Sequence, residues 1–359
     1  MLRFAARAAS ALALASALAL TATTPALADP PQPAATDIVG VGAGVTESLF
    51  NQYSTEYNAF LTASGNTTSP RLYSWDSTGT NYITTKTGAS PIVRPIRSTS
   101  GILTLNAYGN DTVDFARSAR RPGIDDPVTD LFVAMAKDAV SWAAPAGGNA
   151  PADLMTRDLA LIYSCYYTNW QQISPSLPDA TIVPVLGIAG PATLTDSSAF
   201  FLQAIGQGSS VEPGPCVRGV RWENQGTDAI LHDPNAIVPY SVGRYIGQVY
   251  GGHTRPGDDP GVLTVRSIDG IAPVDSSNQM PLQFTSTVYA RVLFNVVRNA
   301  DWNSGTPRGT ALRAVFGSNG WICKNAAATT TLKSHGFRSL PIGACGSTVH
   351  SNGWPVSVN

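Results

Sequence analysis

Three short segments of the chain combine the glycines, hydroxyls and guanidinium groups that proteins use to bind oxyanions. The first reads Gly-Ala-Gly-Val-Thr at residues 42–46, between a strand-like apolar run at 37–41 and an amphipathic segment. Glycines let a backbone approach a ligand closely, and the N–H groups and positive dipole end of a first helical turn favour an anion. We predict that Gly44, Val45 and Thr46 form an anion cradle, although such a turn is also common as a plain tight connection.

The second and third segments add hydroxyls and positive charge. Residues 94–101 place Ser98 and Thr99 ahead of an apolar run, which indicates another helix start. Residues 114–121 follow a short strand and contain Arg117, Ser118 and Arg120, whose donors suit oxyanions. Either segment alone is typical of a turn or a solvated basic face. Their recurrence at strand ends favours one shared anion site.

The elements that must position these residues alternate between strand-like and helical patterns. Strands are predicted at 37–41, 92–95, 113–115, 131–142 and 182–186, and helices at 49–61, 199–205 and 241–249. Thr46 stands where the first helix needs an N-cap. This alternation predicts an α/β protein, and ligands of open α/β sheets lie at the carboxyl ends of the strands. The three segments fall at such ends.

Other kinds of chemistry find little support. The four histidines are far apart and have no metal-ligand spacing, and no Gly-x-Ser-x-Gly elbow is present. The acidic pairs at 125–126 and 258–259 stand among prolines and glycines, which favours solvated turns. We therefore predict no catalytic residue, no metal and no cofactor.

The N-terminus has the pattern of a secretory signal peptide, predicted to cover residues 1–28. Arg3 and Arg7 precede an apolar run, and Ala-Leu-Ala at 26–28 supplies the small residues of a cleavage site. The first cysteine is Cys165, so a lipid anchor is not expected. The net charge of −1 argues against nucleic-acid and membrane-surface partners. A secreted or periplasmic location follows.

The four cysteines fit that oxidising location, where two disulfides are expected. Four cysteines allow three connectivities. We predict that neighbours pair, Cys165 with Cys216 and Cys323 with Cys345. Each bridge is expected to be structural, because no redox or metal-binding spacing is present.

The order of the motifs along the chain resembles the PstS-type phosphate-binding proteins of ABC importers and their secreted DING-type relatives. The resemblance rests on five collinear pieces and runs from about residue 37 to 297. These pieces are Gly-Ala-Gly-Val-Thr at 42–46, Ser-Thr-Ser-Gly at 98–101, Asp-Phe-Ala-x-Ser at 114–118, Leu-Ile-Tyr-Ser-x-x-x-Thr-Asn-Trp at 161–170, and Asn-Ala-Ile-Val-Pro-Tyr-Ser-Val at 235–242.

This resemblance implies a two-lobe type 2 periplasmic-binding fold with two crossover strands. Residues 37–136 with 286–359 would form lobe 1, residues 137–285 lobe 2, and the long apolar segments at 131–142 and 282–297 the crossovers. The anion would be held by donors from four loops: Gly44, Val45, Thr46, Glu47, Ser98, Thr99, Ser118, Thr195, Ser197 and Ser198.

Two departures from the family pattern concern the charges at the site. Ala119 follows Ser118 where the family has an aspartate, and the arginine of the fourth loop is absent. Arg117 or Arg120 could replace the donor, and Asp196 the acceptor.

The resemblance implies a non-enzymatic binding protein for phosphate or a related tetrahedral oxyanion. An ABC importer membrane subunit is its implied partner, and a monomer its expected state. Two alternatives stay open: an extracellular interaction module that has lost the small anion, and a phosphatase-like enzyme.

Overall fold

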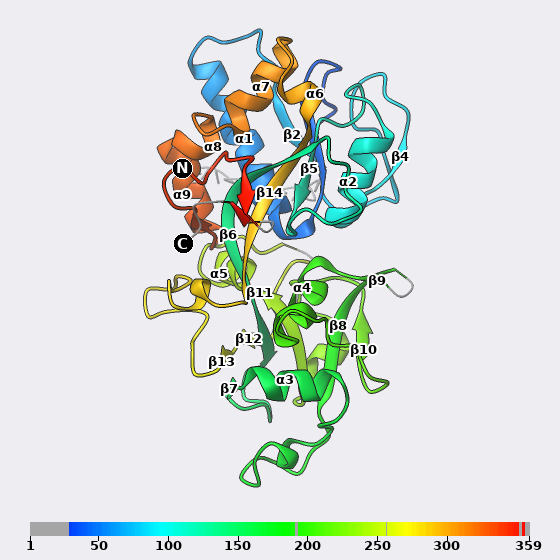
Figure 1. Cartoon of the computed structure of the whole chain (residues 1–359), viewed down its shortest axis with the longest axis vertical. Helices are drawn as coiled ribbons and strands as arrows, with labels where there is room; N and C mark the ends of the chain where they lie inside the picture. The colour runs from blue at the N-terminus through cyan, green and yellow to red at the C-terminus, as the bar shows by residue number, and fades with distance from the viewer. Residues whose placement is uncertain (1–28, 191–192, 256, 352–353, 356–359) are drawn as a thin grey trace, which may run out of the picture.

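Two α/β lobes, one above the other in Figure 1, are joined by two long strands. The computed structural model describes residues 29–190, 193–255, 257–351 and 354–355, so the predicted signal peptide lies outside the described residues. The joining strands are β6 (Asp130–Pro145) and β14 (Ala290–Arg298). They pair antiparallel, with Ala290 opposite Ala139 and Arg298 opposite Asp130.

Lobe 1, the upper part of Figure 1, contains the beginning and the end of the described chain. Its strands β1, β2 and β5 are parallel to one another and continue the sheet beyond β14. The strands of lobe 1 are β1 (Ile38–Gly42), β2 (Leu72–Ser74), β3 (Tyr82–Ile83), β4 (Ile92–Val93), β5 (Phe115–Ser118), β15 (Arg338–Ser339), β16 (His350–Ser351) and β17 (Trp354–Pro355). Its helices are α1 (Glu47–Ala63), α2 (Ser98–Ala107), α6 (Asn299–Trp302), α7 (Pro307–Phe316), α8 (Trp321–Lys324) and α9 (Ala326–Ser334).

Lobe 2, the lower part, continues the sheet on the other side of β6. Within the described residues the whole sheet has 11 strands, and its main path runs β10-β8-β11-β6-β14-β5-β1-β2. The strands of lobe 2 are β7 (Asp153–Leu154), β8 (Val183–Gly190), β9 (Thr193–Leu194), β10 (Arg218–Val220), β11 (Ala236–Ser241), β12 (Leu263–Val265) and β13 (Ser267–Ile268). Its helices are α3 (Thr156–Tyr163), α4 (Asp196–Ile205) and α5 (Val242–Val249).

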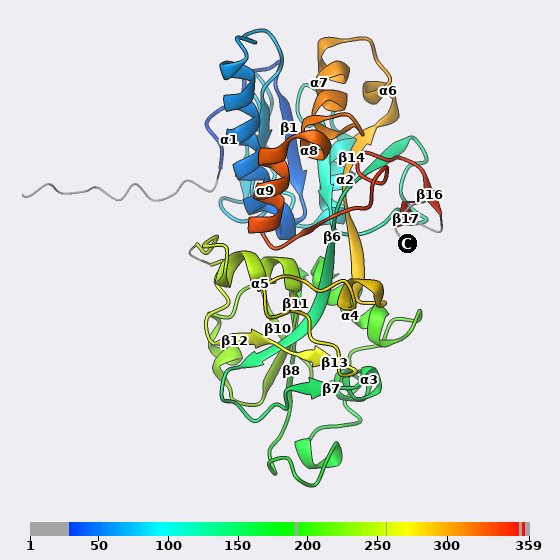
Figure 2. The ribbon, with the colours of Figure 1, turned by 90° about the vertical axis from the view of Figure 1, so that its left-hand side faces the viewer.

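Each lobe buries a core of its own. In lobe 1 the apolar face of α1, including Phe50 and Tyr53, packs with residues of α7, α8 and α9 on one face of the sheet. Helix α2 buries Ile102 in a separate cluster with Val41. Lobe 2 buries Trp142 among residues of α3, α4 and α5. Figure 2 separates the lobes clearly, with β6 and β14 passing between them. The residue boundaries proposed for the lobes stay predictions, because these strands belong to both.

Most predicted strands differ from the structure by a few residues at their ends, and two of them begin later than the sequence predicts. The apolar pattern at 282–297 predicts one long crossover, but the strand begins only at Ala290, after a 3-10 turn at Phe284–Ser286. The strand predicted at 113–115 instead covers Phe115–Ser118, and the Asp114 side chain before it accepts a hydrogen bond from the backbone N–H of Val39 and pairs with Lys86.

The cysteines pair as predicted, Cys165 with Cys216 and Cys323 with Cys345. Their Cα atoms are 5.8 and 5.7 Å apart, within the normal range for disulfides. The first bridge lies in lobe 2 and the second ties the C-terminal part to lobe 1. Neither bridge links one lobe to the other.

Candidate functional site

The glycine-rich run at 42–46 forms a tight turn at the carboxyl end of β1. Gly42 has a φ of 114°, a conformation that favours glycine, and a Cβ there would lie 2.6 Å from the carbonyl oxygen of Arg117. A 3-10 turn at Gly44–Thr46 then leads into α1. The backbone geometry of the predicted cradle is therefore present.

Arg117 lies against this turn and is fully buried. Its guanidinium donates to the carbonyl oxygens of Gly42 and Ala43 at 3.1 Å each, and to that of Trp75 at 2.9 Å. Burial lowers the pKa of Arg117 to about 10. The prediction that Arg117 supplies a charged donor to a ligand is wrong, because its donors hold the backbone of the cradle.

The residues at the start of α1 differ in what they offer. Thr46 occupies the N-cap position, but its hydroxyl makes no capping bond and is buried without a hydrogen-bond partner. The predicted N-cap position of Thr46 is therefore confirmed, without a capping hydrogen bond from its side chain. Val45 is fully buried, and the carboxylate of Glu47 accepts hydrogen bonds from the N–H and hydroxyl of Ser77 at 2.7 Å each.

The start of α2 holds a carboxylate from the other lobe. The backbone N–H and the hydroxyl of Ser98 both donate to one carboxylate oxygen of Asp196, at 2.8 and 2.7 Å. Ser98 also accepts a hydrogen bond from the N–H of Ala119. The N–H groups of a first helical turn bind anions readily. Asp196 therefore takes the position at α2 that an anionic ligand would need.

The other hydroxyls of the fourth loop are engaged within lobe 2 or at the crossover. Ser198 accepts from the N–H of Gly187 at 2.9 Å and from Thr195 at 3.2 Å. Ser197 donates its N–H to Glu223 and accepts from Arg291. Ser197 and Ser198 thus do not act as free donors beside Ser98.

The third loop is tied down in the same way. The hydroxyl of Ser118 donates to the carbonyl oxygen of Arg120 at 2.8 Å, so it serves the loop itself. Arg120 forms an ion pair with Asp126 at 2.6 Å and donates to the hydroxyl of Thr99 at 3.2 Å. Asp126, which the sequence places in a solvated turn, fixes the direction of Arg120.

A second contact between the lobes centres on Arg255, which precedes a proline in a lobe 2 loop. Its guanidinium forms ion pairs with Glu47 and Asp76 of lobe 1 and with Asp258 of its own loop. Asp258 also pairs with buried Arg244, so the prediction of a solvated turn is wrong for this residue. These ion pairs hold the lobes together.

The acidic groups of this cluster lie close enough to affect one another. Burial, and then the charge of Glu47, raise the pKa of Asp76 to about 6, while Arg255 opposes the shift. The sequence analysis missed Arg255 and Asp76. The only local signal is a charged residue inside a loop rich in glycine and proline, and such residues usually face water.

Little space remains between these groups. The cleft beside Gly44 and Ser77 has a cavity of about 30 Å³, room for one or two water molecules. Its charged lining consists of Glu47, Arg97, Asp196, Arg221, Glu223 and Asp258. Acidic groups outnumber basic ones there, and burial, followed by the charge of Asp196, raises the pKa of Glu223. A phosphate dianion would not fit this cleft as it stands.

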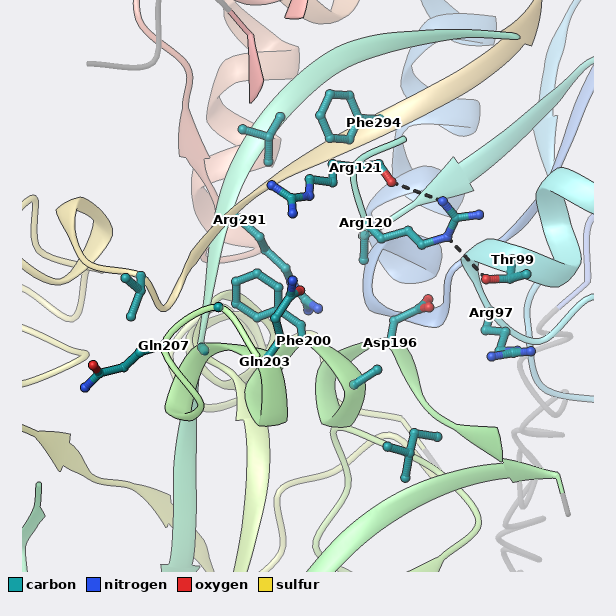
Figure 3. A pocket seen from close by; sticks show the side chains of 17 residues that line it. Arg97, Thr99, Arg120, Arg121, Asp196, Phe200, Gln203, Gln207, Arg291 and Phe294 are labelled. Atoms are coloured by element: carbon teal, nitrogen blue, oxygen red, sulfur yellow. Dashed lines mark hydrogen bonds between the residues drawn. The ribbon is translucent and has the colours of Figure 1, made fainter. Parts of the chain in front are cut away.

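A larger cavity of about 410 Å³ lies on the other side of Asp196, between α4, β14 and the loop after β5 (Figure 3). We call it the arginine cavity. Its polar and charged lining residues are Arg97, Thr99, Arg120, Arg121, Asp196, Gln203, Gln207 and Arg291. Its apolar lining residues are Ala119, Leu194, Ala199, Phe200, Ala204, Val288, Val292 and Phe294.

Arg291 is the most deeply buried charge of this cavity, with 2% of its side chain exposed. It pairs with Asp138 at 2.9 Å, donates to Ser197 at 3.0 Å and lies over the ring of Phe200. Its Nη1 atom has no hydrogen-bond partner. A signal for Arg291 existed in the sequence, since it interrupts an apolar run predicted as a crossover.

The predicted site residues thus fall into two groups. Ser98, Thr99, Arg120 and Asp196 come together where the lobes meet, and Gly44, Val45, Thr46 and Glu47 line or support the adjoining cleft. Arg117, Ser118, Ser197 and Ser198 serve the protein's own backbone and side chains. Thr195 also lines the small cleft.

The two α/β lobes and their two crossover strands form the two-lobe periplasmic-binding fold that the sequence predicts. The ABC-type phosphate transport receptor from Vibrio cholerae is similar in structure, with a TM-score of 0.55 and 16% identity, over 84% of this chain and 99% of that one. A putative phosphate ABC transporter substrate-binding protein from Clostridium perfringens, with bound phosphate, gives a TM-score of 0.57 and 13% identity, over 85% and 99%. At these identities the likeness shows the fold alone.

Comparisons by sequence add no relative: no family model matches the chain, and no curated protein matches it either. Across the part of the chain that the structure describes, no group of three or more histidine, cysteine, aspartate or glutamate residues could hold a metal ion. Nor does any described helix have the length and apolar character needed to cross a bilayer.

Proposed function

We propose that this protein is a secreted, non-enzymatic solute-binding protein, and that its solute carries an oxyanion group which binds where the lobes meet. The observation that carries the proposal is the contact of Ser98 with Asp196, in which one carboxylate oxygen accepts both donors of Ser98, at 2.8 and 2.7 Å. Donors that hold a carboxylate suit a phosphate oxygen equally well. The disulfides fit the oxidising compartment that such a protein occupies.

In this proposal Asp196 competes with the solute. Inorganic phosphate must displace the Asp196 carboxylate from Ser98 before it can bind, and it must then tolerate the remaining acidic groups of the cleft. We therefore expect phosphate to bind weakly to the native protein. An ABC importer membrane subunit is the partner that this function implies, and the protein is expected to act as a monomer.

The experiment removes the competing carboxylate. Asp196→Ala frees both donors of Ser98 and takes away one negative charge, so the affinity for phosphate should rise at least tenfold in a calorimetric titration. Asp158→Ala is the matched control, because Asp158 is also an acidic residue in the first turn of a lobe 2 helix, yet it lies away from the cleft. That variant should bind phosphate as the native protein does.

A second function is favoured by the filled cleft. Arg255 ties the lobes together through Glu47 and Asp76, and only about 30 Å³ stays open beside them. A binding fold closed in this way could act as an extracellular interaction module without a small ligand. If neither the native protein nor Asp196→Ala responds to phosphate, sulfate or arsenate, the oxyanion proposal fails and this second function takes its place.

A further inference from the structure

The arginine cavity differs from the cleft in its size. At about 410 Å³ it lies in the range of pockets that hold small organic molecules, and it is far larger than one inorganic oxyanion requires. It is also contiguous with Asp196 and Thr99, which belong to the junction of the lobes. A ligand in this cavity would therefore contact lobe 1, lobe 2 and the crossover strand β14.

The charged residues that line the cavity favour an anionic ligand. Four arginines line the cavity and Asp196 is the single acidic residue among them. Arg97 makes no hydrogen bond or ion pair with any described residue through its guanidinium. Arg291 keeps an unpartnered Nη1 although it is almost completely buried. A buried guanidinium donor without a partner is costly, and an oxyanion would satisfy it.

The apolar residues that line the cavity favour a ligand that also has an apolar part. Phe200 of α4 and Phe294 of β14 line the cavity (Figure 3). Val292 of β14 also lines it. Covering apolar surface of this kind with an apolar group is favourable, because both surfaces are removed from water. Inorganic phosphate or sulfate would leave that wall exposed to water.

We propose that the arginine cavity binds a small organic anion, one with a carboxylate or phosphate-ester head group and an apolar or aromatic body. The head group pairs with Arg291, aided by the other cavity arginines, and the body packs against Phe200 and Phe294. This inference rests on the proposed function, since it names the class of solute. It assigns that solute to the cavity rather than to Ser98.

The test is a set of calorimetric titrations of the full mature protein with five probes. Phenyl phosphate and phenylacetate present the two head groups on the same ring, phenol lacks the charge, and inorganic phosphate and acetate lack the apolar body. We expect phenyl phosphate, phenylacetate or both to bind at least tenfold more tightly than phenol and than their inorganic or aliphatic counterparts. The stronger of the two identifies the head group.

Two variants locate the binding. Ala199→Phe places a ring in the cavity from an exposed position of α4, and Arg97→Ala removes a cavity charge that has no described partner. Each should weaken the aromatic anion at least tenfold. Arg157→Ala, on the exposed surface of α3, removes an arginine elsewhere and should change nothing.

The outcomes separate this inference from the proposed function. If the aromatic anions bind no better than phosphate or acetate, or if Ala199→Phe leaves their affinity unchanged, the cavity assignment is overturned. The proposed function then still stands or falls on the phosphate affinity of Asp196→Ala. If that variant gains phosphate binding and keeps it when combined with Ala199→Phe, the solute belongs to Ser98 and not to the cavity.

Discussion

The cleft and the arginine cavity lie on two sides of Asp196, and they differ in charge and in space. In the cleft, acidic side chains outnumber arginines and about 30 Å³ stays open. In the arginine cavity, arginines outnumber the single acidic residue and about 410 Å³ stays open. The same fold thus presents a filled, acidic surface and an open, basic one at the same junction.

The difference suggests how a binding fold can change its solute without changing its architecture. Backbone N–H groups and hydroxyls at helix starts suit a small anion held in a dry site. Once a carboxylate of the chain takes those donors, as Asp196 does at Ser98, a new ligand must find its donors elsewhere. Guanidinium groups beside an apolar wall offer them to a larger, amphipathic anion.

The largest effect should come from removing Arg255, on the acidic side of the comparison. Arg255→Met leaves Glu47 and Asp76 near each other without their shared cation. We expect the free energy of unfolding to fall by about 2–3 kcal/mol, less than for a fully buried pair because Arg255 is 21% exposed. Urea unfolding measures the change.

Arg97→Met is the matched substitution in the arginine cavity. It removes a half-buried guanidinium that lines both the cavity and the cleft and takes part in none of the ion pairs found among the described residues, so stability should stay within about 0.5 kcal/mol of the native value. Adding Glu47→Gln to Arg255→Met should recover part of the loss, because it removes one of the two repelling charges. Equal losses for Arg255→Met and Arg97→Met would contradict the contrast between the two regions.

An effect of intermediate size concerns pH, because His335 and Asp76 are buried groups whose pKa values are shifted by their surroundings, Arg255 among them. His335 of lobe 1 is buried, and its Nε2 atom forms a hydrogen bond with Oε1 of Gln52 at 2.9 Å. Its ring stacks on that of His253 of lobe 2, with the ring centroids 3.6 Å apart. Burial, and then the neighbouring charges, lower its pKa to about 2. The unfolded chain takes up this proton near pH 6.5 and the native protein does not.

The sign of the dependence follows directly. The stability that neutral His335 contributes is complete above pH 6.5 and is lost as the pH falls, by about 1.4 kcal/mol per unit. Relative to His335→Gln, the native protein should lose about 2 kcal/mol of unfolding free energy between pH 7 and pH 5.

Asp76 works the other way, since its raised pKa of about 6 adds stability as the pH falls. The unfolding free energy of the native protein minus that of Asp76→Asn should therefore rise by about 1 kcal/mol as the pH falls from 7 to 5. Urea unfolding at each pH tests both signs.

Much of this architecture follows from local pattern. The apolar residues of α1 recur at helical spacing and are buried at Leu49, Phe50 and Tyr53, because a helix that covers a sheet must present one apolar face. The turn at 42–46 follows from its glycines, and the disulfides from the pairing of sequence neighbours. The helix and the turn depend on residues close together in the chain, and the disulfides on the order of the cysteines along it.

The missed parts depend on residues far apart. Arg255 and Glu47 are 208 positions apart, and no local pattern links a lobe 2 loop to the first turn of α1. Arg117 illustrates the same limit, since its type suits a ligand while its contacts are with backbone carbonyl oxygens. Residue type predicts which chemistry is available, and the fold decides which partner receives it.

Thr46 offers the smallest effect and the finest distinction between a ligand donor and a structural one. Its hydroxyl is buried without a partner, and an unsatisfied buried hydroxyl costs free energy. Thr46→Val should therefore stabilise the ligand-free protein by about 1 kcal/mol in urea unfolding. In the Asp196→Ala background it should weaken phosphate binding, because the anion loses a donor. Thr85→Val is the matched control, since the buried hydroxyl of Thr85 donates to the carbonyl oxygen of Thr112 at 2.6 Å and its removal should destabilise. If Thr46→Val destabilises the protein as Thr85→Val does, the Thr46 hydroxyl has a hydrogen-bond partner in the ligand-free protein. It is then a structural group and not a donor available to an anion in the cleft.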